Sequence, residues 1–243
     1  MAASIDNAGE LRSALSDYLV YDDVDSRLNT FIGLAEARFN RELRVAEMLK
    51  IGFPTFSSES SDRNESYFDM AQDVLEFTSL VYTGAGTPYN ELMYESPDIL
   101  INGSKYGTVG RPKNWTLISP LSAGSDLPES TRPTILFSPS ITVAANTTAT
   151  PFTYYYYAEI PSLDGADDAT SNWLIEQQPD LYLYAALAEA GTYLADSSRL
   201  AEFQGRAQSA MDGIIGRDRR LKNHPKRRIV PNGVTNDRAF RLF

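Results

Sequence analysis

The chain has 243 residues, with ordinary hydrophobic (42%) and charged (22%) contents, which is enough sequence to bury a sizeable core. It contains no cysteine, so disulfides and thiolate chemistry are excluded, and its only histidine is His224. The net charge of −10 is unevenly distributed, because residues 217–243 carry nine Lys or Arg and two Asp, a net of +7, whereas the rest of the chain carries −17. An acidic body with a basic C-terminal segment is the main compositional signal.

The N-terminal region predicts two helices. Asn7 is the expected N-cap of a short helix, because Glu10 follows at the spacing of a capping box and apolar residues then recur at helical spacing. A second helix is predicted from about Asp23 to Met48, since its apolar residues form one continuous helical stripe. This stripe consists of Val24, Leu28, Phe31, Ile32, Ala35, Phe39, Leu43 and Ala46.

From about Tyr67 the sequence changes to short segments rich in β-branched and aromatic residues. They are separated by clusters of Gly, Pro and Ser, which is typical of an antiparallel β region. The segment "ESPDILIN" between them is compatible with a short helix. The longest uncharged run, 133–158, argues against a membrane span, because twelve of its 26 residues are Ser, Thr, Asn or Pro. The N-terminus shows no signal-peptide pattern.

Helices are predicted again after Pro161. The helix that begins at Pro179 is apolar almost all round, which indicates burial in a core or between subunits, and we expect the long N-terminal helix to pack against it. The expected fold class is α+β: a helical bundle of N- and C-terminal helices, an inserted antiparallel β region and an extended C-terminal tail. The proposed boundaries are 1–64 and 161–216 for the two parts of the bundle, 65–160 for the β region and 217–243 for the basic tail.

Four consecutive tyrosines, Tyr154, Tyr155, Tyr156 and Tyr157, raise a packing question. On a strand, Tyr154 and Tyr156 share one face and Tyr155 and Tyr157 share the other. A single domain usually has a core on only one side of a sheet. We therefore expect at least one of the two pairs to lie at a subunit interface. The alternative is a strand whose second face is covered by a helix of the same chain.

The sequence contains no recognisable catalytic constellation. His224 stands alone in the basic tail, and the chain has no Cys–His cluster for zinc, no phosphate-binding glycine loop and no nucleophile elbow. Asp164, Asp167 and Asp168 form one acidic cluster, but their spacing does not fit a calcium-binding EF-hand loop, and a solvated loop is expected. We predict a protein that is not an enzyme and that has no cofactor and no metal.

Several stretches together resemble the phage head–tail adaptor family, the connector proteins that lie beneath the portal. The resemblance covers about residues 5–215 and is carried by the order and separation of the stretches, since each alone is only a packing pattern. The stretches are "FIGLAEARFNRELR" (31–44), "DVLEFTSLVY" (73–82), "YYYYAEIPSL" (154–163) and "NWLIEQQPDLYLYAALAEAGTYLAD" (172–196).

This resemblance implies a structural virion protein at the head–tail junction, assembled in the host cytoplasm. Family members form rings of twelve subunits that bind the portal protein above and a tail nozzle or tail-tube protein below. Genomic DNA passes through the lumen without specific binding, and an acidic body suits this role because it repels phosphates. The resemblance assigns no catalytic residue.

The resemblance also implies a C-terminal extension that docks into the portal. The basic tail is therefore the candidate portal-binding element, and we expect it to fold only on docking. Its candidate residues are Arg217, Arg219, Arg220, Lys222, Lys226, Arg227, Arg228, Arg238, Phe240, Arg241, Leu242 and Phe243, while Tyr154, Tyr155, Tyr156 and Tyr157 are the candidates for the subunit interface.

Other readings of the sequence remain open. Another tail structural protein, such as a tail-fibre attachment or tube protein, fits long helices around one inserted sheet less well. A nucleic-acid-binding module would bind phosphates through its basic tail. However, few aromatic residues lie between the basic ones to stack on bases, and the acidic body would oppose binding. An unrecognised hydrolase is the weakest alternative.

Overall fold

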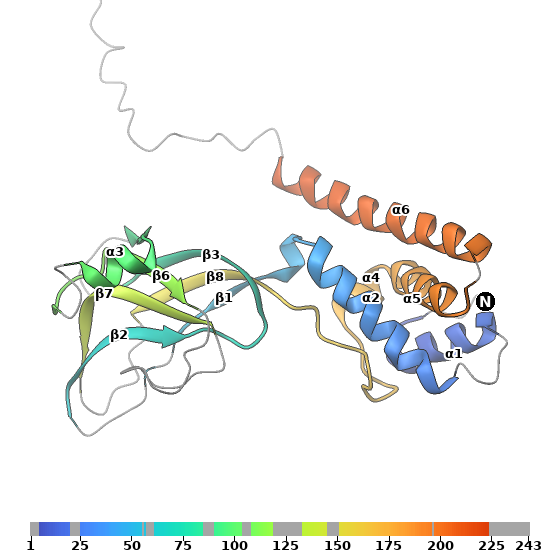
Figure 1. Cartoon of the computed structure of the whole chain (residues 1–243), viewed down its shortest axis with the longest axis horizontal. Coiled ribbons are helices and arrows are strands. Elements are labelled where there is room, and N and C mark those ends of the chain that lie inside the picture. The colour runs from blue at the N-terminus through green and yellow to red at the C-terminus, as the bar shows by residue number, and fades with distance from the viewer. Residues whose placement is uncertain are drawn as a thin grey trace, which may run out of the picture.

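The computed structural model describes residues 5–19, 25–54, 56, 61–84, 90–103, 108–118, 133–144, 151–195 and 197–223. These residues form a helical bundle and a β-rich part, which lie end to end along the longest axis of the molecule (Figure 1). Helices occupy both ends of the described chain, and the strands lie between them. The predicted α+β class, with a β region inserted between bundle helices, is confirmed.

The helical bundle is assembled from both ends of the chain around one central helix. That helix is α5 (Pro179–Tyr193), which packs against α1 (Ala8–Leu19), α2 (Leu28–Glu42), α4 (Trp173–Gln177) and α6 (Ser197–Lys222). Nine of the fifteen α5 residues are buried, which explains why its sequence shows no polar face. The predicted packing of the N-terminal helix against α5 is confirmed: Phe39 and Tyr182 meet edge to face in one core, with ring centroids 5.1 Å apart.

The N-terminus of α1 is capped by the residue that the sequence predicts. The Asn7 side-chain oxygen accepts a hydrogen bond from the Glu10 amide at 2.9 Å. The Glu10 carboxylate accepts one from the Asp6 amide at 2.7 Å, one residue earlier than in a standard capping box. The cap therefore satisfies one of the first amides of the helix, that of Glu10, and also the Asp6 amide just before the cap.

The long helix predicted for residues 23–48 is shorter in the structure. Residues 20–24 lie outside the described chain, α2 ends at Glu42, and short 3₁₀ turns (Asp25–Arg27 and Ala46–Met48) flank it. Leu43 has an extended backbone, and Leu43 and Val45 are both buried. The predicted C-terminal end of this helix, at Met48, is wrong. An extended segment with alternating side chains can bury the apolar residues Leu43 and Val45 as well as a helix can.

The β-rich part consists of two four-stranded sheets. The first has the order β1 (Leu49–Gly52), β8 (Phe152–Ala158), β3 (Val74–Tyr82) and β4 (Asn90–Glu91). The second has the order β2 (Arg63–Asp69), β7 (Thr134–Val143), β6 (Asn114–Ile118) and β5 (Met93–Tyr94). The pairs are antiparallel, as predicted, except that β5 runs parallel to β6. A short helix, α3 (Pro97–Asn102), forms where it was expected and contacts β6.

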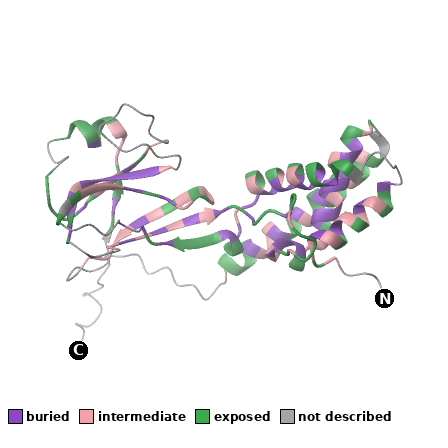
Figure 2. Cartoon of the chain, turned by 90° about the horizontal axis from the view of Figure 1, so that it is seen from below, coloured by how far each residue is buried: buried purple, intermediate pink, exposed green. Residues whose placement is uncertain are grey.

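The two sheets enclose a hydrophobic core that is distinct from the core of the bundle. Aromatic rings fill it, and the centroid of Phe152 lies 4.6 Å from that of Phe137 and 5.5 Å from that of Phe68. Buried residues accordingly form two groups, one in each part of the molecule (Figure 2). The chain passes from bundle to sheet at β1, which precedes the predicted start of the β region at residue 65, and it returns to the bundle after β8.

Candidate interaction surface

The four tyrosines alternate along β8 as the strand geometry predicts. Tyr154 and Tyr156 point into the core between the sheets and are only 3% and 5% exposed. Tyr155 and Tyr157 point to the opposite face and are half-buried. We call this opposite face of the β1–β8–β3–β4 sheet the outer face.

The inner pair is held by partners on β1 and in the turn between β2 and β3. Gly52 of β1 lies directly opposite Tyr154, and a β-carbon at Gly52 would lie 2.1 Å from the Tyr154 ring, so only glycine leaves room for it. The Tyr154 hydroxyl accepts a hydrogen bond from the Ala71 amide at 3.1 Å. The Tyr156 hydroxyl donates to Asp73 at 3.1 Å. Both rings are thus buried with their polar ends satisfied, as buried tyrosines require.

Asp73 and its partners form a small charged group at the edge of this core. The Lys50 ammonium lies 2.7 Å from the Asp73 carboxylate. Burial alone would raise the pKa of Asp73, but the hydrogen bond and charge of Lys50, together with the Tyr156 hydroxyl, outweigh it and lower that pKa below its usual value. Burial and the adjacent carboxylate raise the pKa of Tyr156 to about 12. Tyr156 therefore stays protonated and acts as a donor at physiological pH.

The outer face carries an exposed apolar stripe. In the β1–β8 register, Leu49 lies opposite Tyr157 and Ile51 opposite Tyr155, so their side chains share this face. Phe53 continues the alternation just beyond β1. Leu49, Ile51 and Phe53 are 43%, 54% and 60% exposed, and we call these three residues the β1 stripe.

The position of β1 adds to this exposure. Among the described strands, β1 is at the edge of its sheet and pairs only with β8 (Figure 1). An edge strand offers unpaired backbone groups, and proteins usually protect such an edge with outward charges, Pro or a covering segment. The one charged residue of β1, Lys50, faces inward to Asp73. An apolar stripe beside an uncovered strand edge is an arrangement that suits a protein contact.

The two outer tyrosines differ in how far their own chain covers them. Tyr157 packs against the bundle core, and the Lys222 ammonium at the end of α6 lies 5.8 Å from its ring centroid. Tyr155 lies instead beside the exposed Ile51. Of the four tyrosines, Tyr155 is therefore the one that adjoins the most exposed part of the outer face.

The apolar pattern of residues 196–221 predicts a last helix that ends at Leu221, whereas the proposed domain boundary begins the extended tail at residue 217; the structure follows the helical pattern, so the first basic residues of the tail are helical. Arg217, Arg219, Arg220 and Lys222 lie in the last turns of α6, because this helix continues to Lys222. The correction has a packing reason: Asp218 is buried, and its carboxylate accepts a hydrogen bond from the Ala46 amide at 2.9 Å, which fastens this end of α6 to the chain between α2 and β1.

The cations at this end of α6 have different surroundings. Arg217 bonds to Gln177 at 2.8 Å and to Glu47 at 3.3 Å, and Lys222 pairs with Asp218 at 2.7 Å. Arg219 and Arg220 are exposed. The remaining tail candidates lie outside the described residues; they are Lys226, Arg227, Arg228, Arg238, Phe240, Arg241, Leu242 and Phe243.

A buried carboxylate that the sequence analysis missed joins the β-rich part to the bundle. Glu36 of α2 accepts hydrogen bonds from the Ser162 hydroxyl at 2.6 Å, the Leu163 amide at 2.7 Å and the Tyr182 hydroxyl at 3.1 Å. Asn172 donates to Tyr182 at 2.7 Å and also caps α4. These contacts hold the segment after β8 against α2 and α5.

Glu36 is only 5% exposed. Burial raises the pKa of its carboxyl group, although the hydrogen bonds from Ser162, Leu163 and Tyr182 act to lower it. A signal for it exists in the sequence, because Glu36 falls on the apolar side of α2, between Ala35 and Phe39. An acidic residue at an apolar-face position of a helix indicates a buried polar contact.

The acidic loop at 164–168 serves the fold. Asp168 pairs with Arg12 at 2.6 Å, while Asp164, Asp167 and Asp168 are all exposed. Within the described residues, no group of three or more His, Asp or Glu is arranged to hold a metal ion. No helix in the described part of the chain is both long and apolar enough to cross a membrane.

Comparison with known proteins agrees with the resemblance seen in the sequence. No curated protein matches the chain. The family model for the SU10 adaptor protein matches residues 6–230, which covers both the bundle and the β-rich part. The matched region includes α1 to α6 and both sheets described above. The chain therefore belongs to the SU10 adaptor protein family, a phage head–tail adaptor family, and is a virion component.

Proposed function

We propose that copies of this adaptor form a ring, of twelve subunits as in the proteins it resembles, which joins the portal to the tail and lines the DNA passage. The β1 stripe, beside an edge of β1 that no other described strand covers, is the observation that carries this proposal. A closed ring needs a head-to-tail interface, in which one patch of each subunit contacts a different patch of the next. The outer face supplies one such patch, with Tyr155 in it.

The chemistry of the outer face supports a protein contact rather than a solvent-facing role. Single exposed apolar residues are normal on any surface. Here, however, Leu49, Ile51 and Phe53 are consecutive on one face and adjoin Tyr155. Large aliphatic and aromatic side chains of this kind form the centres of protein interfaces, where charged residues are depleted. Covering them with a neighbouring subunit would also cover the edge of β1.

A matched pair of substitutions tests the ring. Ile51→Asp places a charge in the β1 stripe, and Ile99→Asp makes the same change at a similarly exposed position on α3. Oligomer mass is measured by mass photometry and analytical ultracentrifugation, with and without purified portal. We expect wild type and Ile99→Asp to form rings and Ile51→Asp to remain monomeric at the same concentration. Rings of normal mass formed by Ile51→Asp would contradict the assignment of this surface.

We assign portal binding to the basic C-terminal segment. The support is its net charge of +7 over residues 217–243 and its apolar end, Phe240, Leu242 and Phe243. Basic residues would steer the segment to an acidic crevice on the portal, and the apolar residues would anchor it. In the described part, Arg219, Arg220 and Lys222 are the exposed cations of this set, with Lys222 paired to Asp218, and they lie where α6 ends.

The portal assignment is tested by removing the segment and by neutralising it. Truncation after Asn223 leaves α6 and both described cores intact. We expect the truncated protein to melt like the wild type but to be lost from purified heads. Replacing Lys226, Arg227 and Arg228 by Gln should weaken attachment at low salt, and the difference from wild type should shrink at high salt because the charges are then screened. Heads that keep a full complement of truncated protein would overturn the assignment.

Passage of DNA without binding is supported by the net charge of −17 outside residues 217–243. Such a body repels phosphates, and a basic lining would instead bind them through counterion release. A filter-binding assay with duplex DNA tests this part of the proposal. We expect no retention at about 0.15 M salt. Retention that depends on the tail and falls steeply with salt would favour a nucleic-acid-binding module instead.

A further inference from the structure

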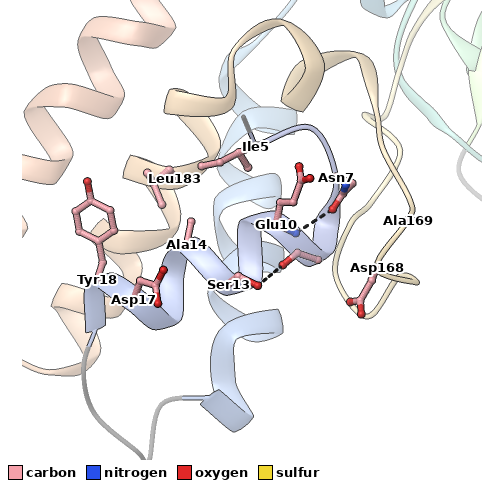
Figure 3. A pocket seen from close by; sticks show the side chains of 11 residues that line it. Ile5, Asn7, Glu10, Ser13, Ala14, Asp17, Tyr18, Asp168, Ala169 and Leu183 are labelled. Carbon is pink, nitrogen blue, oxygen red and sulfur yellow. Dashed lines mark hydrogen bonds between the residues drawn. The ribbon is translucent and has the colours of Figure 1, made fainter. Parts of the chain in front are cut away.

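A groove on the bundle, away from the outer face, has an apolar floor and an acidic rim. It has a volume of about 890 Å³ and runs along the exposed side of α1, between the loop at 168–169 and α5. Ile5, Ala14 and Leu183 gather on its α5 side, as Figure 3 shows. Its described lining residues contain no Lys or Arg and include Glu10, Asp17 and Asp168, of which Asp168 pairs with Arg12 and Glu10 accepts a hydrogen bond from the Asp6 amide.

The loop side of the groove is firmly attached to α1. The amides of Ala8 and Gly9 donate to the carbonyls of Thr170 and Asp168 at 2.9 and 3.0 Å. Gly9 permits this close approach, because a β-carbon there would lie 2.8 Å from the β-carbon of Asp168. The groove is therefore formed by the fold itself before anything binds in it.

The apolar floor continues beyond the groove. A second depression of about 230 Å³ lies between α1, α5 and α6, and Tyr18, which is 49% exposed, lines both. On α5, Leu183 lines the first depression and Leu187, one turn later, lines the second. Because Leu183 is only 7% exposed and Leu187 is fully buried, the accessible apolar surface is that of Ile5, Ala14 and Tyr18; the carboxylates lie along the first depression, and Arg199 lines the second. An extended segment with alternating cations and apolar side chains would complement this surface.

The chain itself contains such a segment. Residues 224–243 include five Lys or Arg and one Asp, a net of +4, and they end in "AFRLF", where Phe240 and Leu242 alternate with Arg241. We propose that this segment binds in the α1 groove of its own chain before the protein docks on a portal. The Phe and Leu side chains then occupy the apolar floor, and Arg238 and Arg241 face the carboxylates of the rim.

The segment is long enough to reach the groove. The 26-residue α6 is about 39 Å long at 1.5 Å per residue, and it follows α5 after a short turn, so it returns along α5. Leu183 of α5 is therefore no farther from the end of α6 than roughly that length. Twenty extended residues span up to about 70 Å, which exceeds this separation.

Attachment to the same chain makes even a weak contact sufficient. Exposed ion pairs contribute little individually, but attachment to the same chain gives the segment an effective concentration on the order of millimolar at the groove. Binding there would hold the portal-binding residues away from other partners until a portal competes for them. The contact does not depend on the portal, so it stands or falls separately from the proposed function.

The absence of cysteine allows a direct measurement in the full-length protein. Ala169→Cys at the groove and Ala239→Cys near the C-terminus provide the two label positions for single-molecule energy transfer between dyes. We expect a high-transfer state in the monomer at physiological salt. Glu10→Lys with Asp17→Lys should lower the ratio of high- to low-transfer molecules by about tenfold. Glu91→Lys with Asp212→Lys, an equal charge change on other exposed positions, should leave the ratio unchanged.

A charge swap separates a specific contact from general repulsion. Arg238→Glu with Arg241→Glu should also open the molecule, and combining it with the groove reversal should restore the high-transfer state. The inference is overturned if wild type shows low transfer, or if the groove and control reversals have equal effects. Transfer seen only between two separately labelled copies would also overturn it. The groove variant Glu10→Lys with Asp17→Lys, which leaves the basic segment unchanged, should bind portals at least as well as wild type; a loss of portal binding in the wild type with the contact intact would count against the proposed function alone.

Discussion

The two faces of the β1–β8–β3–β4 sheet are built from the same strands, yet among the described residues only the inner face is fully covered. On the inner face, Tyr154 lies over Gly52, and Tyr156 donates to Asp73. On the outer face, Tyr155 lies beside Ile51, more than half of which is exposed. The inner face is thus part of the fold of this chain, and the outer face is the surface that we propose for contact with a neighbouring copy.

The largest loss of stability is expected when a charge is placed on the buried side of α2 rather than on its exposed side. Phe31→Asp buries an unpaired charge in the bundle core, because Phe31 is only 3% exposed and its ring lies 5.8 Å from that of Tyr193. We expect a loss of about 4 kcal/mol or more and little soluble folded protein. Leu34→Asp, on the exposed side of the same helix, should change the free energy of unfolding by less than about 0.5 kcal/mol. Urea unfolding measures the free energy of unfolding of both variants. A wild-type value for Phe31→Asp would show that Phe31 does not lie in the core.

The sheet itself offers the next contrast, between adjacent tyrosines. Tyr154→Ala removes a ring packed against Phe68 and Tyr156 and should cost about 3–5 kcal/mol, as other large aromatic truncations in cores do. Tyr155→Ala should cost about 1 kcal/mol or less in the monomer. Chemical denaturation of monomeric protein measures both. Equal losses would mean that the outer face is as well packed within the chain as the inner one.

Gly52 allows a more specific test of the inner face. Gly52→Val favours strand conformation by propensity, but its side chain would enter the Tyr154 ring, so we expect a loss of about 1–3 kcal/mol. In a double-mutant cycle, the same change made in the Tyr154→Ala background should cost much less, because the ring is gone. Additive losses would show that Gly52 is needed for a reason other than the ring.

The smallest effect concerns the charges at the border of the inner face. The pKa of Asp73 is lowered in the folded protein, so its stabilising contribution is present above its unfolded value, near 3.8, and is lost as pH falls through the folded pKa. Lys50→Met should flatten the pH dependence of stability in this acidic window by less than about 1 kcal/mol, since the pair is partly exposed. Ile51→Met, on the neighbouring outer position, serves as the control. Identical acid unfolding curves for wild type and Lys50→Met would show that the Asp73–Lys50 pair does not contribute to the pH dependence of stability.

Several features followed directly from local patterns in the sequence. Alternation placed Tyr154 and Tyr156 on one face of β8 without any tertiary information, and the absence of a polar face on α5 predicted its central burial. Asn7 caps α1 because a side-chain oxygen at that spacing meets the amide three residues on. Each of these depends on residues close together in the chain.

The remaining features depend on contacts between distant segments, which no local period encodes. Glu36 is buried because Ser162, Leu163 and Tyr182 converge on it, and Asp218 is buried because it accepts a hydrogen bond from the distant Ala46 amide. Likewise, alternation showed that Tyr155 faces away from Tyr154, but only the strand order placed Ile51 next to it on an uncovered edge. The sequence by itself determined the elements and their apolar faces, through local geometry. Tertiary structure decided which faces are covered, because burial is a property of the neighbours that a segment acquires on folding.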